Sequence, residues 1–290
     1  MMKRTALILV IGVLIGLTAC GRNQSTQDNK IMEKKEETQA IIDAEGRVLS
    51  ERIQTPEGYT RTEAKEDSLA TFLRNYPLKV AGSEVLLYNG NPKGNQRAHV
   101  AVFELPIEEY DLQQCADSVM RIYAEYFWHT GQYDRIAFHF TNGFLAEYSK
   151  WREGYRISVN GNRVSWNHSS SYDDSYECFV QYLKMVFSYA GTMSMETEAE
   201  KIEPDEIEVG DVFLHGASPG HVVMVVDVCE DAAGNRAFLL AQGYMPAQEF
   251  HILKNMKHED NPWYYVEEIE FPFRTPEYTF REGELKRLKY

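Results

Sequence analysis

Cysteine is scarce in this chain of 290 residues, which carries four: Cys20, Cys115, Cys178 and Cys229. So low a content excludes a small scaffold held together by disulfides. If Cys20 is modified by lipid, as its context below indicates, three thiols remain. An odd number leaves at least one thiol that is free or paired with another molecule.

Concentrated positive charge is also lacking. The formal net charge is −14 at pH 7, and Lys and Arg form no basic patch or stripe. Proteins that bind nucleic acid need such a surface for the phosphates, so we expect no nucleic-acid partner. His215 and His221 stand six positions apart without a carboxylate or thiolate placed as a further ligand. We therefore expect no metal site, and no motif indicates a cofactor.

Long apolar runs are confined to the first 20 residues. The apolar stretch at 6–17 follows two basic residues and is too short to span a bilayer comfortably. Leu17-Thr18-Ala19-Cys20 resembles the bacterial lipobox, which implies cleavage before Cys20 and acylation of its thiol; the alternative is an uncleaved anchor. We expect a membrane-anchored protein outside the cytoplasm. Gly21 favours the outer membrane, with the body facing the periplasm or the cell surface.

Three segments follow from composition. Residues 1–20 are the expected signal peptide, and residues 21–47 are polar and charge-mixed, which is typical of a flexible linker. Residues 48–290 are expected to form a single α+β domain, the alternative being two domains divided near Ser169. With 43% hydrophobic residues and 4 Trp, 18 Tyr and 14 Phe, the chain can bury a sizeable core.

Hydrophobic periodicity predicts helices and strands along the domain. The expected helices span 62–76, 111–128 and 175–190. The expected strands span 85–88, 99–105, 136–140, 144–151, 155–159, 212–214, 222–228, 237–241 and 248–253. The strand at 222–228 is β-branched almost throughout, so we expect it at the centre of the sheet and buried on both faces.

His221 is the candidate general base. It follows Ser218-Pro219-Gly220 at the start of the central strand, where a tight turn and a dry sheet can hold an imidazole rigidly with one face open. The alternative is a histidine that stabilises the turn through a bond to a backbone carbonyl.

Three short stretches resemble the CHAP-type amidases and the related papain-like cell-wall endopeptidases: Gly210-Asp211-Val212, Gly220-His221-Val222 and Leu240 to Tyr244. The resemblance implies a papain-like core, with helices packed on a mostly antiparallel sheet. It implies that His221 is catalytic, that a polar residue such as Gln242 orients it, and that a cysteine at a helix start is the nucleophile. The implied substrate is a cell-wall peptide or a related amide.

Two cysteines are candidates for the nucleophile. Cys115 follows Gln114 at an expected helix start, where the helix dipole and free N–H groups stabilise a thiolate. It lies 106 residues before His221, which requires a large insertion, and it also fits an apolar stripe. Cys178 begins a stretch that resembles the nucleophile helix of the endopeptidases. That match aligns the family's cysteine with Tyr176, two residues earlier. Two residues are about 200° around a helix, so Cys178 would point in another direction. A third possibility is that neither cysteine is catalytic.

Gln114, Tyr244 and Gln248 are candidates for binding substrate. From His99 onward the chain also resembles a family of secreted lipoproteins whose domain has no assigned function, through 111–117, 140–144, 189–192 and 240–248. Two hypotheses follow. One is a cysteine peptidase or amidase acting on cell-wall peptide; the other is a non-catalytic lipoprotein that binds peptide or glycan in the same cleft.

Overall fold

The computed structural model describes residues 40–290. The predicted signal peptide, Cys20 and most of the predicted linker lie outside these residues. Ala40–Tyr290 forms one compact unit, so the folded region begins earlier than residue 48. Asp43 N–H donates to the Arg52 carbonyl at 2.8 Å and Gln54 N–H to the Ile41 carbonyl at 2.7 Å, which holds the first residues of this unit in place. Within the described part, no helix has the length and apolar character needed to cross a membrane.

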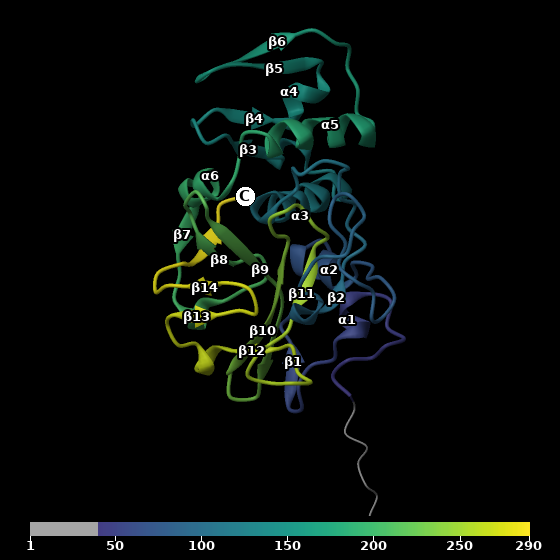
Figure 1. Cartoon of the computed structure of the whole chain (residues 1–290), viewed down its shortest axis with the longest axis vertical. Helices are drawn as coiled ribbons and strands as arrows, with labels where there is room; N and C mark the ends of the chain where they lie inside the picture. The colour runs from purple at the N-terminus through teal and green to yellow at the C-terminus, as the bar shows by residue number, and fades with distance from the viewer. Residues whose placement is uncertain (1–39) are drawn as a thin grey trace, which may run out of the picture. The chain divides into compact units, whose positions relative to one another are not determined.

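A large antiparallel sheet dominates the unit (Figure 1). Its main path runs in the order β2 (His99–Val102), β11 (His251–Leu253), β10 (Arg236–Gln242), β9 (His221–Asp231), β8 (Val212–His215), β15 (Leu285–Leu288) and β7 (Ala199–Lys201). Off this path, β1 (Tyr59–Arg61) pairs with β9 and β12 (Tyr264–Tyr265) pairs with β10. Three two-stranded sheets complete the strands: β3 (Ala137–His139) with β4 (Leu145–Glu147), β5 (Tyr155–Asn160) with β6 (Arg163–His168), and β13 (Phe273–Arg274) with β14 (Thr279–Phe280).

The helices are few and mostly short. They are α1 (Leu49–Arg52), α2 (Leu69–Arg74), α3 (Cys115–His129), α4 (Tyr148–Arg152), α5 (Tyr176–Phe187) and α6 (Thr192–Thr197). This combination confirms the expectation of a mixed α and β fold with a mostly antiparallel sheet.

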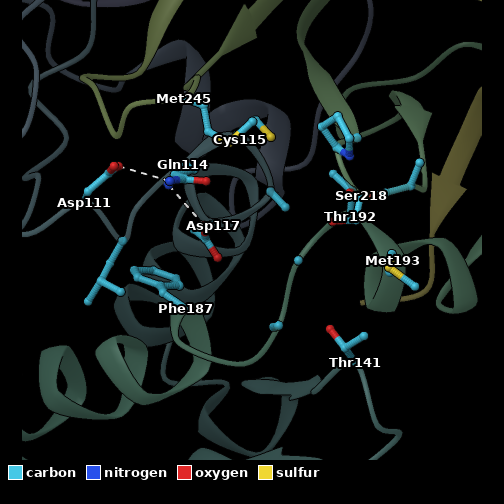
Figure 2. A pocket seen from close by; sticks show the side chains of 17 residues that line it. Asp111, Gln114, Cys115, Asp117, Thr141, Phe187, Thr192, Met193, Ser218 and Met245 are labelled. Carbon is cyan, nitrogen blue, oxygen red and sulfur yellow. Dashed lines mark hydrogen bonds between the residues drawn. The ribbon is translucent and has the colours of Figure 1, made fainter.

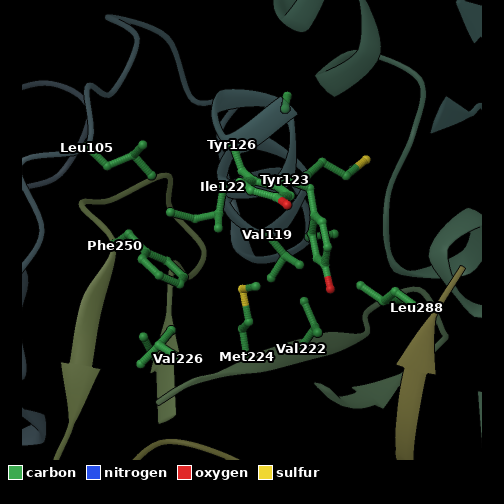
Figure 3. Close-up of a cluster of buried hydrophobic side chains, with 14 of the residues drawn as sticks. Leu105, Val119, Ile122, Tyr123, Tyr126, Val222, Met224, Val226, Phe250 and Leu288 are labelled. Carbon is green, nitrogen blue, oxygen red and sulfur yellow. The ribbon is translucent and has the colours of Figure 1, made fainter. Parts of the chain in front are cut away.

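The central strand is buried on both faces, as its sequence predicts. Val222, Met224 and Val226 belong to the core under α3 (Figure 3), whereas Val223 and Val225 belong to a second cluster that includes the β13–β14 hairpin. Alternation along β9 sends successive side chains to opposite faces. Because both faces are covered, β9 is a rigid base for the residue at its start.

Helix α3 packs across this sheet. Val119, Ile122 and Tyr123 lie over Val222 and Met224 in Figure 3. The helix starts at Cys115, later than the predicted position 111. Gln114 N–H donates to Asp117 Oδ2 at 3.0 Å, a capping bond that satisfies one of the free donors at the helix start.

Residues 133–190 form an insertion between α3 and β8, drawn at the top of Figure 1, and it contains α4, α5 and the strands β3 to β6. It accounts for the long spacing between Cys115 and His221. The predicted strand at 144–151 is wrong in its second half, because the chain turns into α4 after Glu147. Strand β6 was not predicted; it is largely exposed and carries little apolar signal.

Two further expectations need correction. The helix predicted over 62–76 is confined to α2, because Thr62 N–H donates to the Val228 carbonyl at 3.1 Å along β9. Arg61 and Arg74 each place Nε 2.7 Å from an oxygen of Asp227 on β9, and these ion pairs hold the segment extended against the sheet. The stretch at 85–88 forms only isolated bridges, Leu86 to Pro92 and Leu87 to Gln248.

Candidate functional site

Cys115 is the first residue of α3, and its side chain is 7% exposed. Its thiol lies by the backbone N–H groups of Cys115 and Ala116 at the helix start and of Val222 on β9. Burial, reinforced by the negative charge of Asp117, raises the pKa of the Cys115 thiol to about 11, while these N–H groups act in the opposite direction. The resting group is therefore a neutral thiol beside donors that can stabilise a thiolate.

His221 is the first residue of β9. The residue after it, Val222, has the backbone N–H that lies by the Cys115 thiol. Its ring is 2% exposed, and burial lowers its pKa to about 4, so the imidazole is neutral at pH 7. Nε2 lies 2.8 Å from Oε1 of Gln242, the last residue of β10. The structure thus joins two of the three predicted site residues directly, through neighbouring strands of the sheet.

Glu277 determines which atoms of that pair face each other. Gln242 Nε2 donates to Glu277 Oε2 at 2.8 Å. A carboxylate only accepts, so the amide of Gln242 must turn its NH₂ group to Glu277 and its oxygen to His221. His221 Nε2 must then carry the proton, which leaves Nδ1 of the neutral ring as the proton acceptor.

Lys93 and His251 lie beside Glu277 and keep its carboxyl group ionised. Although burial alone would raise its pKa, the neighbouring His251 ring and the hydrogen bond and positive charge of Lys93 lower the pKa of Glu277 to about 2. Lys93 is itself buried at 5% exposure and contacts both Glu277 and His251 Nε2, the latter at 3.2 Å. Sequence reasoning missed Glu277 because it lies in a tail segment without a motif; only its position beside Gln242 reveals it.

Aromatic rings enclose His221. The ring centroid of Tyr244 lies 4.5 Å from that of His221, and the ring of Tyr278 lies 4.7 Å away. The Tyr244 hydroxyl donates to the Glu277 carbonyl at 3.4 Å. These rings exclude water from the imidazole, which is the physical cause of its lowered pKa.

Gly243 lets the end of β10 approach the start of α3. A Cβ at this position would lie 2.2 Å from Ser118 Oγ and 3.0 Å from the Gln114 carbonyl oxygen, distances that no side chain tolerates without movement. The glycine therefore sets how closely Gln242 and its neighbours can lie to Cys115.

A cavity of about 490 Å³ opens in front of Cys115 (Figure 2). Most of its lining comes from three parts of the chain: the start of α3, the turn before β9 and the region around α6 and the end of α5. Thr141 and Met245 complete it. The lining residues are Asp111, Leu112, Gln114, Cys115, Ala116, Asp117, Thr141, Phe187, Ala190, Gly191, Thr192, Met193, Ala217, Ser218, Pro219, Gly220 and Met245.

The predicted binding residues are placed differently from one another. Gln114 lines the cavity, with Nε2 bonded to Asp111 Oδ1 at 3.0 Å. Tyr244 lies against His221. Gln248 is 3% exposed, donates to the Pro246 carbonyl at 3.0 Å and is outside the cavity lining. The structure therefore gives Gln114 and Tyr244, but not Gln248, a place near Cys115 and His221.

The other cysteines lie elsewhere. Cys178 is buried in α5 beside Trp151 and Arg156 of the insertion, and it does not line the cavity. Cys229 is buried near the far end of β9, opposite Ala237. Within residues 40–290, no three His, Cys, Asp or Glu side chains gather as a metal-binding group.

Fold and site together define an α+β protein with a thiol at a helix start that lines a cavity, and with a buried imidazole–amide pair at the ends of two neighbouring strands. Gly220, the residue before His221, lines that cavity, whereas His221 and Gln242 do not. Residues 49–287 match the family described as domain of unknown function (4846), and since this match spans most of the chain, the chain belongs to that family. Neither the curated proteins nor the solved structures compared with the chain contain a match.

Proposed function

We propose that this protein is a cysteine peptidase or amidase with a papain-like core, which cleaves an amide bond in cell-wall peptide or a related extracytoplasmic substrate. Cys115 is the nucleophile, His221 the general base and Gln242 the residue that orients it. One observation carries the proposal. The Glu277–Gln242–His221 chain of hydrogen bonds makes Nδ1 of His221 the proton acceptor, and the next residue, Val222, has the backbone N–H that lies by the Cys115 thiol.

The chemistry follows from these atoms. His221 Nδ1 accepts the thiol proton as Cys115 Sγ attacks the substrate carbonyl carbon. The N–H groups at the start of α3 are placed to stabilise the developing oxyanion. Imidazolium then gives its proton to the leaving amine, and the thioester that remains is hydrolysed by water with His221 again as base. Because the resting thiol and imidazole are both neutral, proton transfer accompanies attack and does not precede it.

The membrane anchor belongs to the same proposal. The lipobox-like stretch ending at Cys20 supports acylation there and a position on the outer membrane, facing the periplasm or cell surface, where cell-wall peptide is within reach. Metabolic labelling with a radioactive fatty acid tests it. We expect label on the full-length chain and none on Cys20→Ser; equal labelling of both would contradict the anchor.

Peptidoglycan digestion tests the catalytic role. The full-length protein is incubated with soluble peptide fragments of the cell wall, and new amino groups are followed by mass spectrometry. We expect both Cys115→Ser and His221→Ala to lose about 10³-fold or more of the rate, because a pair that acts as a unit fails as a unit. Cys178→Ser is the matched control and should keep the rate. A Cys115→Ser protein that cleaves normally rules out this mechanism.

The second candidate is a non-catalytic protein that binds peptide or glycan in the same cavity. The burial of Cys115 and His221, at 7% and 2% exposure, favours it, because a closed site holds the pair neutral. Calorimetric binding of the same fragments separates the two. Binding without cleavage, unchanged in Cys115→Ala, supports the binder.

A further inference from the structure

Asp117 lies in the first turn of α3 and lines the same cavity as Cys115 (Figure 2). Its side chain is 6% exposed. One oxygen, Oδ2, accepts the capping bond from Gln114 N–H, but Oδ1 is buried and has no hydrogen-bond partner. A buried polar atom without a partner costs free energy, so Oδ1 needs an explanation that the helix cap does not supply.

The ionisable residues that line the cavity indicate the sign of the charge that a ligand would carry. Asp111 and Asp117 are the carboxyl side chains among the described lining residues, and none of that lining is basic. Asp111 is exposed, and its Oδ1 already accepts from Gln114 Nε2 at 3.0 Å and Ala247 N–H at 2.7 Å. Leu112, Phe187 and Met193 add apolar surface. The cavity is therefore acidic and partly apolar, with one unused acceptor at its buried end.

We propose that Asp117 binds a cationic nitrogen of the substrate, carried on an aliphatic stem that lies against Leu112 and Phe187. This inference rests on the proposed function, since it places an amino-bearing residue next to the amide bond cleaved at Cys115. The cation would supply Oδ1 with the partner that it lacks in the protein. Burial raises the pKa of the Asp117 carboxyl to about 8, and a bound positive charge offsets this burial and favours the ionised form.

Charge-selective labelling of Cys115 tests the proposal without any need for catalysis. Two reagents of the same shape are compared at pH 8.5: 2-(trimethylammonio)ethyl methanethiosulfonate and its neutral analogue 3,3-dimethylbutyl methanethiosulfonate. In both reactions the thiolate attacks the sulfenyl sulfur, forms a mixed disulfide and releases methanesulfinate. The ratio of the two rates cancels the ionisation of the thiol. Peptide mass mapping separates Cys115 from Cys178 and Cys229.

Two variants of equal charge change make the comparison specific. Asp117→Asn keeps an oxygen that can cap Gln114 N–H and removes the charge, whereas Asp111→Asn removes the exposed charge from the same cavity. We expect the cationic reagent to be favoured about tenfold in the wild type, with the preference lost in Asp117→Asn and kept within about twofold in Asp111→Asn, as a nearby, partly screened charge implies. Circular dichroism and thermal unfolding confirm that each variant is folded.

If Cys115 proves too buried to react, the same ratio is measured on Met193→Cys in a Cys115→Ser background, because Met193 lines the cavity and is 47% exposed. A ratio near one in the wild type, or one that Asp117→Asn leaves unchanged, overturns the cation site even if peptide cleavage is observed. A cation preference that depends on Asp117 upholds the site even if the digestion shows no cleavage.

Discussion

Glu277 acts on His221 through an intermediate side chain, so its substitution should change catalysis. Substitution also leaves the buried Lys93 ammonium without its carboxylate partner, so a loss of stability accompanies it. In Glu277→Gln the new amide can present either a donor or an acceptor to Gln242, so the orientation of the Gln242 amide is no longer unique. We expect kcat to fall about tenfold or more with KM little changed, because the imidazole loses its defined tautomer. Steady-state kinetics on a peptide substrate measure this.

Asn95→Ala is the control for that variant. Asn95 donates to Glu277 Oε1 at 3.2 Å, so its loss removes one bond to the carboxylate but leaves the contact between Oε2 and Gln242. The rate should stay close to that of the wild type. If both variants lose activity equally, Glu277 contributes general structure and not the orientation of Gln242.

His251 makes the stability of the fold depend on pH. It is fully buried, its Nδ1 bonds to the Glu249 carbonyl at 2.8 Å, and burial lowers its pKa to about 4 from the usual 6.5. The unfolded chain takes up the proton first as pH falls, so the stabilisation is complete above pH 6.5 and is lost as pH falls through about 4.

Urea unfolding of the wild type and His251→Gln at several pH values isolates this contribution. We expect the difference in unfolding free energy between the two proteins to shrink by on the order of 2–3 kcal/mol between pH 7 and pH 4. His221 titrates over the same range in both proteins and cancels in the difference. A difference that does not change with pH would show that His251 keeps its usual pKa in the fold.

At the scale of elements, the contact between the end of β10 and the start of α3 aligns the site. Gly243→Ala inserts a methyl group where Ser118 Oγ would lie 2.2 Å away, so the strand end and the helix must separate. We expect a loss of stability of about 1–3 kcal/mol, and a larger relative loss of activity because Gln242 moves away from Cys115 together with its strand. Thermal unfolding and steady-state rates measure the two effects.

Ser118→Ala offers a test of the cause. Ser118 Oγ is buried without a hydrogen-bond partner, so its removal should cost little in the wild type. In the double variant it removes the closest contact of the new methyl group and should restore part of the activity. No restoration would place the damage of Gly243→Ala in the other close contacts of the new Cβ, with the Gln114 carbonyl oxygen and Ser118 Cβ at 3.0 Å, and not in the contact with Ser118 Oγ.

At the scale of the whole molecule, the insertion at 133–190 is bound to the core by a polar network centred on the buried Arg121. Arg121 of α3 is fully buried, donates to Glu125 at 2.7 Å and reaches the Tyr176 hydroxyl of α5 at 2.9 Å. Limited proteolysis should therefore give a single resistant fragment that begins near Ala40 and keeps the insertion. Two stable fragments that meet near Ser169 would contradict a single cooperative unit.

The sequence alone determined the parts of this protein that local pattern encodes. The valine-rich run at 222–228 predicted a strand buried on both faces. The turn before His221 indicated a rigidly held imidazole. The resemblance of Gly220-His221-Val222 and Leu240 to Tyr244 to the cell-wall amidases implied its pairing with Gln242, which hairpin-connected strands allow because their ends are adjacent. A helix near Cys115 was also predictable, since its apolar residues recur at helical spacing.

Only the tertiary structure decided the rest. Glu277 reaches Gln242 across 35 positions of chain, and no periodicity in the tail signals that contact. The unpartnered oxygen of Asp117 and the close approach at Gly243 are likewise properties of neighbours brought together by folding. The helix expected at 62–76 is shortened to α2 for the same reason, because the bond from Thr62 N–H to the Val228 carbonyl and the ion pair of Arg61 with Asp227 hold the preceding chain against β9. Local pattern records which side chains are buried, whereas the path of the chain decides which of them meet.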